Sequence, residues 1–140
     1  MAIRQLNPYL NFDGTATKAI ALYEKALGAK VERVQKFGDV PGMQSPAENK
    51  DRVIHALLRI GDGVVMISDS QPGVPIAAGN NMHVTLDFED AADMARRFDA
   101  LSAGGRITMP LQDTFWGAKF GMLQDAYGIQ WMFNCETKKS

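Results

Sequence analysis

Cysteine is nearly absent from this sequence, since Cys135 is the single one among 140 residues. An intramolecular disulfide is therefore impossible, and a metal site built from several cysteines is excluded. Because Cys135 ends a largely apolar run over residues 131–135, the sequence favours a buried, inert thiol over a reactive one.

Long apolar runs are also missing. No stretch approaches the roughly 20 apolar residues that a membrane-spanning helix needs. Residues 1–5 lack the apolar core of a signal peptide. We therefore expect a cytoplasmic protein that has no membrane partner.

Neither sign of charge is in excess, because 15 Lys and Arg residues stand against 16 Asp and Glu residues, for a net charge of -1. This balance offers no basic surface for a phosphate backbone, so nucleic acid is not expected as a partner. The hydrophobic fraction of 46% is that of an ordinary globular protein. At this length we expect a single domain over residues 1–140, with a core that buries roughly two-thirds of the unfolded surface.

The strongest positive feature is an internal repeat, in which the segment that begins at Asn7 aligns with the segment that begins at His83. Alternation of apolar and polar residues predicts that each copy opens with a strand. The aligned positions that share a residue type are Leu10 with Leu86, Phe12 with Phe88, Ala16 with Ala92, Ala19 with Ala95 and Gly28 with Gly104. One structural unit is therefore expected twice.

A helix follows the opening strand in each copy, because apolar residues recur at helical spacing over residues 16–27 and 91–101. Asp13 or Thr15 is available as the N-cap of the first helix, and Asp90 starts the second. Glycines mark the two C-terminal ends, at Gly28 and at Gly104-Gly105.

Three further strands are predicted after each helix. They span about residues 29–38, 53–60 and 63–70 in the first copy, and about 105–112, 117–124 and 129–135 in the second. The sequence thus predicts an α+β fold of two βαβββ modules. The modules cover about residues 5–70 and 81–135, with a linker over about residues 71–80.

Several short motifs accompany this duplication. They are residues 8–14 (Pro-Tyr-Leu-Asn-Phe-Asp-Gly), 54–56 (Ile-His-Ala), 66–69 (Met-Ile-Ser-Asp), 113–117 (Asp-Thr-Phe-Trp-Gly) and 125–132 (Asp-Ala-Tyr-Gly-Ile-Gln-Trp-Met). Because of the duplication and these motifs, the whole chain resembles the vicinal oxygen chelate (glyoxalase/bleomycin resistance/dioxygenase) superfamily. The motifs themselves are similar to those of the PhnB subgroup. The resemblance implies a cup-shaped cavity formed by the two modules, a small-molecule ligand and a homodimer.

Metal-dependent members of this superfamily hold their ion with four side chains, which the resemblance places at Asn7, Met66, His83 and Met132. Only His83 is a good ligand for the divalent ions of this chemistry, because a thioether is a weak substitute for a carboxylate. We therefore expect neither a metal nor another cofactor. The methyltransferase label attached to the PhnB subgroup finds no support either, since the sequence lacks a strand-glycine-loop-helix element for a nucleotide-like cofactor.

Nine residues are candidates for the site. His83 and His55 alternate with apolar residues and should face the cup, as catalytic groups or as structural hydrogen-bonding histidines. For His83 a third alternative is a residual metal ligand. Asn7 and Tyr9 offer polar contacts to a ligand, and Met66 and Met132 form an apolar floor or ordinary core. Phe115, Trp116 and Phe120 form a ligand-binding wall, an internal packing cluster or a subunit contact beside Gly117 and Gly121, where a ligand or another backbone can approach.

Three hypotheses for the function follow. The first is a metal-free protein that binds a small, partly apolar molecule, either to sequester it or as an enzyme that uses His83 and His55. The second is a metal-dependent isomerase, lyase or dioxygenase of the glyoxalase type, and the third is a structural homodimer without a ligand. The fold alone does not choose among them, because function resides in the site.

Overall fold

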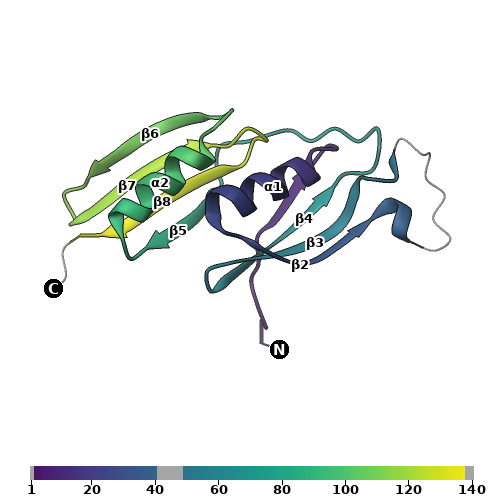
Figure 1. Cartoon of the computed structure of the whole chain (residues 1–140), viewed down its shortest axis with the longest axis horizontal. Coiled ribbons are helices and arrows are strands. Elements are labelled where there is room, and N and C mark those ends of the chain that lie inside the picture. The colour runs from purple at the N-terminus through teal and green to yellow at the C-terminus, as the bar shows by residue number, and fades with distance from the viewer. Residues whose placement is uncertain (1, 41–48, 138–140) are drawn as a thin grey trace. The chain divides into compact units, whose positions relative to one another are not determined.

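The computed structural model describes residues 2–40 and 49–137 (Figure 1). The chain divides into two compact units, Met1–Ala77 and Ala78–Ser140. The boundary between the units lies within the proline- and glycine-rich segment that the sequence marks as a linker. Within the described ranges, no helix is both long and apolar enough to cross a membrane.

The first unit contains one mixed four-stranded sheet with the strand order β1-β4-β3-β2. Strand β1 is parallel to β4, and the other neighbours are antiparallel. Its elements are β1 (Tyr9–Phe12), α1 (Ala16–Leu27), β2 (Lys30–Lys36), the short 3-10 helix η1 (Phe37–Asp39), β3 (Val53–Ile60) and β4 (Gly63–Asp69).

The second unit repeats this topology with the order β5-β8-β7-β6. Strand β5 is again the parallel partner, here of β8. Its elements are β5 (Val84–Phe88), α2 (Ala91–Leu101), β6 (Arg106–Asp113), β7 (Ala118–Gln124) and β8 (Gln130–Glu136). The prediction of two βαβββ modules in an α+β fold is therefore confirmed.

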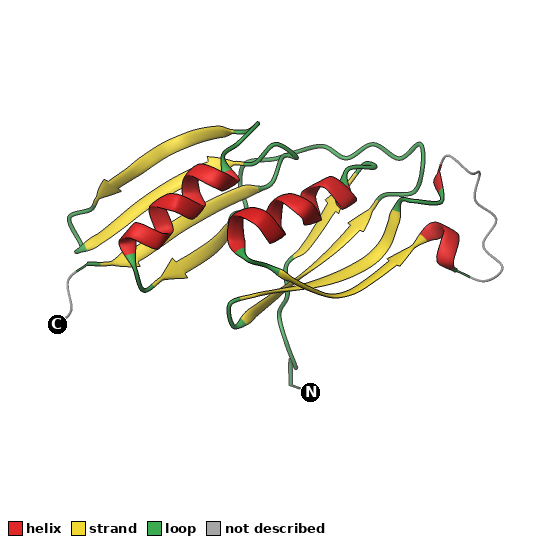
Figure 2. Cartoon of the chain, in the orientation of Figure 1, coloured by secondary structure: helices red, strands yellow, loops and turns green. Residues whose placement is uncertain are grey.

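Each helix packs on one face of the sheet in its own unit (Figure 2). In the first unit, Phe12, Ile67 and Leu58 point to the helix side of the sheet, and these side chains and Tyr23 of α1 are almost completely buried. In the second unit Phe133 plays the central part. Its ring lies edge-on to Phe98 of α2 at 5.0 Å and stacks on Phe88 at 5.3 Å, between ring centroids. Two small apolar cores therefore hold the units.

The N-terminal caps of the two helices differ. Asp90 caps α2 as predicted, since its carboxylate accepts hydrogen bonds from the backbone N–H groups of Ala92 and Asp93. Thr15 occupies the N-cap position of α1, but its side chain makes no capping hydrogen bond with the described residues. The prediction of Thr15 as the N-cap residue is confirmed, but the side chain that accepts the hydrogen bond from Ala16 is the carboxylate of Asp69, from a distant strand.

The C-terminal ends of the helices also differ. Gly28 ends α1 as expected, in the left-handed conformation (φ 66°) that glycine adopts without strain. Helix α2 ends already at Leu101, before Gly104-Gly105. Gly105 serves another purpose, because a side chain there would collide with the backbone of Gln124 and Asp125.

Candidate functional site

The face of each sheet opposite its helix, called the far face below, carries most of the predicted site residues. In the first unit the residues that alternate with the buried core positions point to this face. Tyr9 of β1, Met66 of β4 and His55 of β3 are all incompletely buried, whereas their neighbours Leu10, Ile67 and Ala56 lie in the core. The predicted orientation of His55, away from the helix, follows from this alternation.

Tyr9 and His55 form the central polar contact of this far face. The Tyr9 hydroxyl lies 3.1 Å from Nδ1 of His55, within hydrogen-bonding distance. The two rings meet at an interplanar angle of 63°, with their centroids 6.0 Å apart. The pair is exposed. It can therefore present to a ligand one hydroxyl and one imidazole that already interact with each other.

An apolar row lies beside this pair. Met66 is directly opposite Tyr9 on one side and Leu57 on the other. Directly opposed residues on neighbouring strands point to the same face, with Cβ atoms about 4.5–5.5 Å apart. The first far face thus combines a thioether and an aliphatic side chain with the polar Tyr9–His55 pair.

Asn7 lies before β1 and is not drawn into the Tyr9–His55 contact. Its amide oxygen accepts a hydrogen bond of 2.9 Å from Nε2 of Gln5. The strand predicted from residue 7 begins only at Tyr9. Asn7 therefore has a local partner, and its predicted contact with a ligand stays a prediction.

The far face of the second unit is richer in sulfur. Met132 of β8 is directly opposite Thr85 of β5 and Met122 of β7. Met122 is in turn directly opposite Met109 of β6. In the sequence repeat Thr85 corresponds to Tyr9, and Met132 is opposite Thr85 as Met66 is opposite Tyr9. The two predicted floor methionines therefore occupy equivalent register positions in the two sheets.

The predicted aromatic cluster forms at the turn between β6 and β7. Trp116 lies perpendicular to Phe115, at a centroid distance of 4.9 Å, and 6.2 Å from Phe120. Phe115 is 96% exposed and Trp116 is 58% exposed. A side chain at Gly121 would collide with the side chain and backbone of Leu111, so the missing side chain lets another strand approach closely. Two of the three rings are therefore largely open to solvent within this unit.

His83 precedes β5 and is partly exposed. Among the residues that the structure describes, its imidazole has no hydrogen-bond or ring partner. His55 belongs to the first unit and His83 to the second. The predicted pair of catalytic histidines is therefore divided between two units, and their joint action stays a prediction.

The positions that hold a metal in relatives do not fit a divalent ion. Asn7 and Met66 in the first unit and His83 and Met132 in the second supply one imidazole, one amide and two thioethers. Catalytic sites for such ions use several imidazole and carboxylate donors. In the described parts of the chain, no group of three or more His, Cys, Asp or Glu residues is arranged to hold a metal ion.

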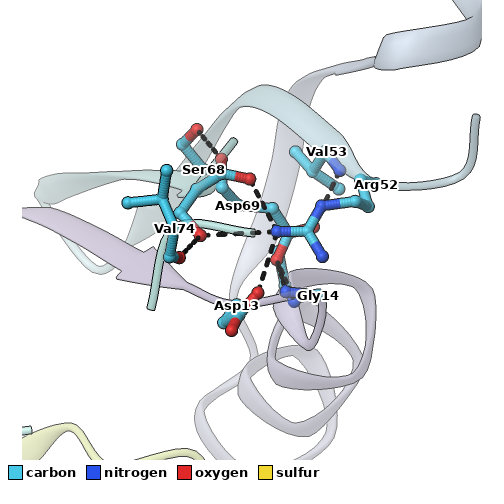
Figure 3. Close-up of polar contacts among 9 residues, drawn as sticks. Asp13, Gly14, Arg52, Val53, Ser68, Asp69 and Val74 are labelled. Carbon is cyan, nitrogen blue, oxygen red and sulfur yellow. Dashed lines mark hydrogen bonds and ion pairs between the residues drawn. The ribbon is translucent and has the colours of Figure 1, made fainter. Parts of the chain in front are cut away.

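A buried polar cluster at the end of β4 was missed by the sequence reasoning (Figure 3). Asp69 is only 4% exposed, and its carboxylate accepts hydrogen bonds from the backbone N–H groups of Gly14, Ala16 and Val53, at 2.8, 3.1 and 2.8 Å. It supplies the cap that Thr15 does not. The available signal in the sequence was an aspartate at the end of an apolar strand. Its hydrogen-bond partners could not be identified from the sequence, because they lie 16 to 55 positions away in the chain.

Arg52 extends this cluster (Figure 3). Its Nη2 donates to the backbone oxygen of Ser70 at 2.6 Å and to Asp13 at 3.1 Å. The Ser70 hydroxyl donates to the backbone oxygen of Val74 at 2.8 Å. These groups connect the start of α1 to the start of β3 and the end of β4. The cluster is therefore structural.

Three comparisons place the chain among known proteins. The profile of the Glyoxalase/Bleomycin resistance protein/Dioxygenase superfamily matches residues 5–133. Protein YjdN of Escherichia coli (strain K12) is 36% identical over 138 residues, which cover 92% of this chain and 93% of that protein.

Solved structures agree with the family. The crystal structure of protein PA1353 from Pseudomonas aeruginosa superimposes with a TM-score of 0.85 at 39% identity, covering 97% of this chain and all of that one. A PhnB protein from Bacillus cereus, described as a putative 3-demethylubiquinone-9 3-methyltransferase, matches with a TM-score of 0.78. At 24% identity, over 94% of this chain and 99% of that one, it shows a shared fold alone. The repeated topology and these matches lead to one conclusion: the chain belongs to the glyoxalase/bleomycin resistance protein/dioxygenase superfamily.

Proposed function

We propose that this protein binds a small, partly apolar molecule and does so without the divalent metal that many members of its superfamily use. The observation that carries the proposal is the first far face. There the Tyr9–His55 pair lies on the same face as the half-buried Met66 and Leu57. Small-molecule sites typically combine an apolar lining with a few polar groups that fix the orientation of the ligand.

The apolar side chains and the polar Tyr9–His55 pair of the first far face together define the class of ligand. Thioether and aliphatic side chains adapt to apolar surfaces of varied shape. The Tyr9 hydroxyl can donate or accept a hydrogen bond, and the His55 imidazole does both through its two nitrogens. A molecule with an apolar, preferably flat body and one hydroxyl or carbonyl group can contact the apolar side chains and form a hydrogen bond with the Tyr9–His55 pair.

The metal-dependent alternative has less support. A glyoxalase-type reaction requires an ion that acts as a Lewis acid on a substrate oxygen. Both positions that would supply a carboxylate hold methionine, at Met66 and Met132. The donor set thus favours organic ligand binding, with His55 as the group that holds or transfers a proton at its ring nitrogen.

Two matched probes test the proposal: 2-naphthol, which carries one hydroxyl, and 2-methylnaphthalene, which replaces this hydroxyl with a methyl group. We expect 2-naphthol to bind more tightly in a fluorescence titration and to raise the melting temperature, because a ligand that binds only the folded state stabilises it. The variants Tyr9→Phe and His55→Phe should remove the preference for 2-naphthol. The control Tyr127→Phe, in the turn before β8, should retain it.

The outcomes separate the alternatives. Binding of neither probe would contradict the proposal. Equal binding of both probes by the unaltered protein would contradict the role of the Tyr9–His55 pair.

The exposed aromatic residues Phe115 and Trp116 support a second proposal, that the chain forms a homodimer. Aromatic side chains are enriched at interfaces between proteins, and these two are 96% and 58% exposed. Sedimentation at micromolar concentration should show a dimer, and the double variant Phe115→Ser, Trp116→Ser should shift it toward monomer. A monomer in both samples would contradict this proposal.

A further inference from the structure

The second far face contains a row of three methionines on three adjacent strands. Met122 of β7 lies between its two directly opposed neighbours, Met132 of β8 and Met109 of β6. The sheet bulges on both sides of Met109, and these bulges bring Met109, rather than a neighbour in the chain, opposite Met122. All three side chains are partly exposed.

The register places the three methionines in one row across β6, β7 and β8. Met122 and Met132 are a regular pair, and such pairs have Cβ atoms about 4.5–5.5 Å apart on one face of the sheet. Methionine is unbranched and has three rotatable bonds beyond Cα, so its sulfur adapts to a partner at little steric cost. Partial exposure leaves the row accessible to an ion from solution.

The chemistry of the row is selective. Thioethers are soft ligands that prefer Cu(I), whereas hard divalent ions prefer carboxylate, carbonyl and water oxygens. Asp87, two residues after Thr85 on β5, accepts a hydrogen bond of 3.1 Å from the amide of Asn134, its register partner. A donor set of thioethers without an added charge suits a monovalent ion.

We propose that Met109, Met122 and Met132 form a thioether site for Cu(I). This inference goes beyond the proposed function, because it concerns a different ligand on the sheet of the other unit and does not involve Tyr9 or His55. The first far face serves as an internal comparison. There Met66 is flanked by Tyr9 and Leu57, so within β1, β3 and β4 that register row has a single thioether.

The test is a competition for Cu(I) between the full-length protein and the chromophoric chelator bicinchoninate, under anaerobic conditions with ascorbate present. The protein should withdraw about one equivalent of Cu(I) from the chelator. Met122→Leu should weaken Cu(I) binding by at least about tenfold, because it removes the central soft donor. Leucine conserves the apolar volume, so this variant should fold normally.

Two control variants make the assignment specific. Met66→Leu removes a partly exposed thioether from the other sheet and should leave Cu(I) binding unchanged. Cys135→Ala removes the buried thiol of the single cysteine and should also leave Cu(I) binding unchanged. Loss of Cu(I) binding in Cys135→Ala would assign the ion to the thiol and overturn the proposal.

Failure of this inference is distinguishable from failure of the proposed function. No withdrawal of Cu(I), or withdrawal that Met122→Leu does not weaken, would overturn the thioether site. Neither result bears on the titration with 2-naphthol, because Met→Leu keeps the face apolar and Tyr9 and His55 are unaltered.

Discussion

The two units share a strand order but not the chemistry of their far faces. Both sheets place a methionine on the strand that is parallel to the opening strand, at Met66 and Met132. In the first unit this methionine faces a tyrosine that contacts His55, whereas in the second it faces Thr85 and a further methionine. Duplication therefore preserves the backbone and the core, while the residues on the far face diverge.

The buried carboxylates show the same divergence. In the first unit Asp69 ties together three segments that lie apart in the sequence. In the second unit, three donors to Asp125 lie within six positions of it in the chain. It accepts hydrogen bonds from the backbone N–H groups of Tyr127 and Ile129 and, at 2.9 Å, from the indole N–H of Trp131. One carboxylate joins the helix to the sheet, and the other shapes a turn.

Asp69→Ala should have the largest effect on stability. It leaves three backbone N–H groups without their acceptor, and each buried donor left unsatisfied costs about 1–3 kcal/mol. We expect a loss of about 3–4 kcal/mol in the free energy of unfolding, measured by urea denaturation. Asp69→Asn, which keeps one acceptor oxygen, should lose clearly less. If Asp69→Ala lowers the free energy of unfolding by less than Asp90→Ala does, the three hydrogen bonds of Asp69 do not have the stabilising role assigned to them.

Asp125→Ala should have the second largest effect. The carboxylate is 3% exposed, but its two backbone partners lie in a turn that water can reach more easily than the partners of Asp69. We expect a loss of about 2 kcal/mol by the same denaturation experiment. An effect greater than that of Asp69→Ala would reverse the comparison between the units.

Substitutions at the N-caps of the two helices should have smaller effects on stability, and the two effects should differ. Asp90→Ala removes the side-chain cap of α2 and should cost about 1 kcal/mol. Thr15→Ala changes the corresponding position of α1, where Asp69 supplies the acceptor, and should cost less than about 0.5 kcal/mol. Equal costs for the two variants, measured in one denaturation series, would show that α1 also depends on its local cap.

Tyr9→Phe should have the smallest effect on stability. The hydrogen bond between Tyr9 and His55 is exposed, so water replaces the lost partner and the cost should stay below about 0.5 kcal/mol. The melting temperature of the variant without ligand checks this. A large loss would indicate that the pair holds the sheet together instead of serving a ligand.

Most of the fold could be predicted from the sequence, because its signals are local. Alternation in β1 and β5, helical spacing after them and the repeat from Asn7 to His83 depend only on neighbours in the chain. The cap of α1 could not be predicted, since Asp69 reaches Gly14 and Ala16 only after β4 has paired with β1. Long-range hydrogen bonds of this kind require the register of the sheet.

The candidate site was predictable to a similar extent. Alternation places His55 on the far face, but its contact with Tyr9 spans three strands and depends on the order β1-β4-β3. Met109 was missed for a related reason. It has the same parity as Ile107 along β6, and only the bulge between them brings Met109 opposite Met122. A bulge interrupts the regular alternation of side chains between the two faces of a strand, and the prediction from the sequence relied on that alternation.

The central claim is that the protein binds a small, partly apolar molecule through the first far face without a divalent metal. Native mass spectrometry tests it most directly, with separate samples that contain 2-naphthol or Zn(II). The account predicts a complex with 2-naphthol that Tyr9→Phe weakens, and no Zn(II) retained at one equivalent. Retention of Zn(II) that His83→Ala abolishes, together with no complex with 2-naphthol, would contradict it.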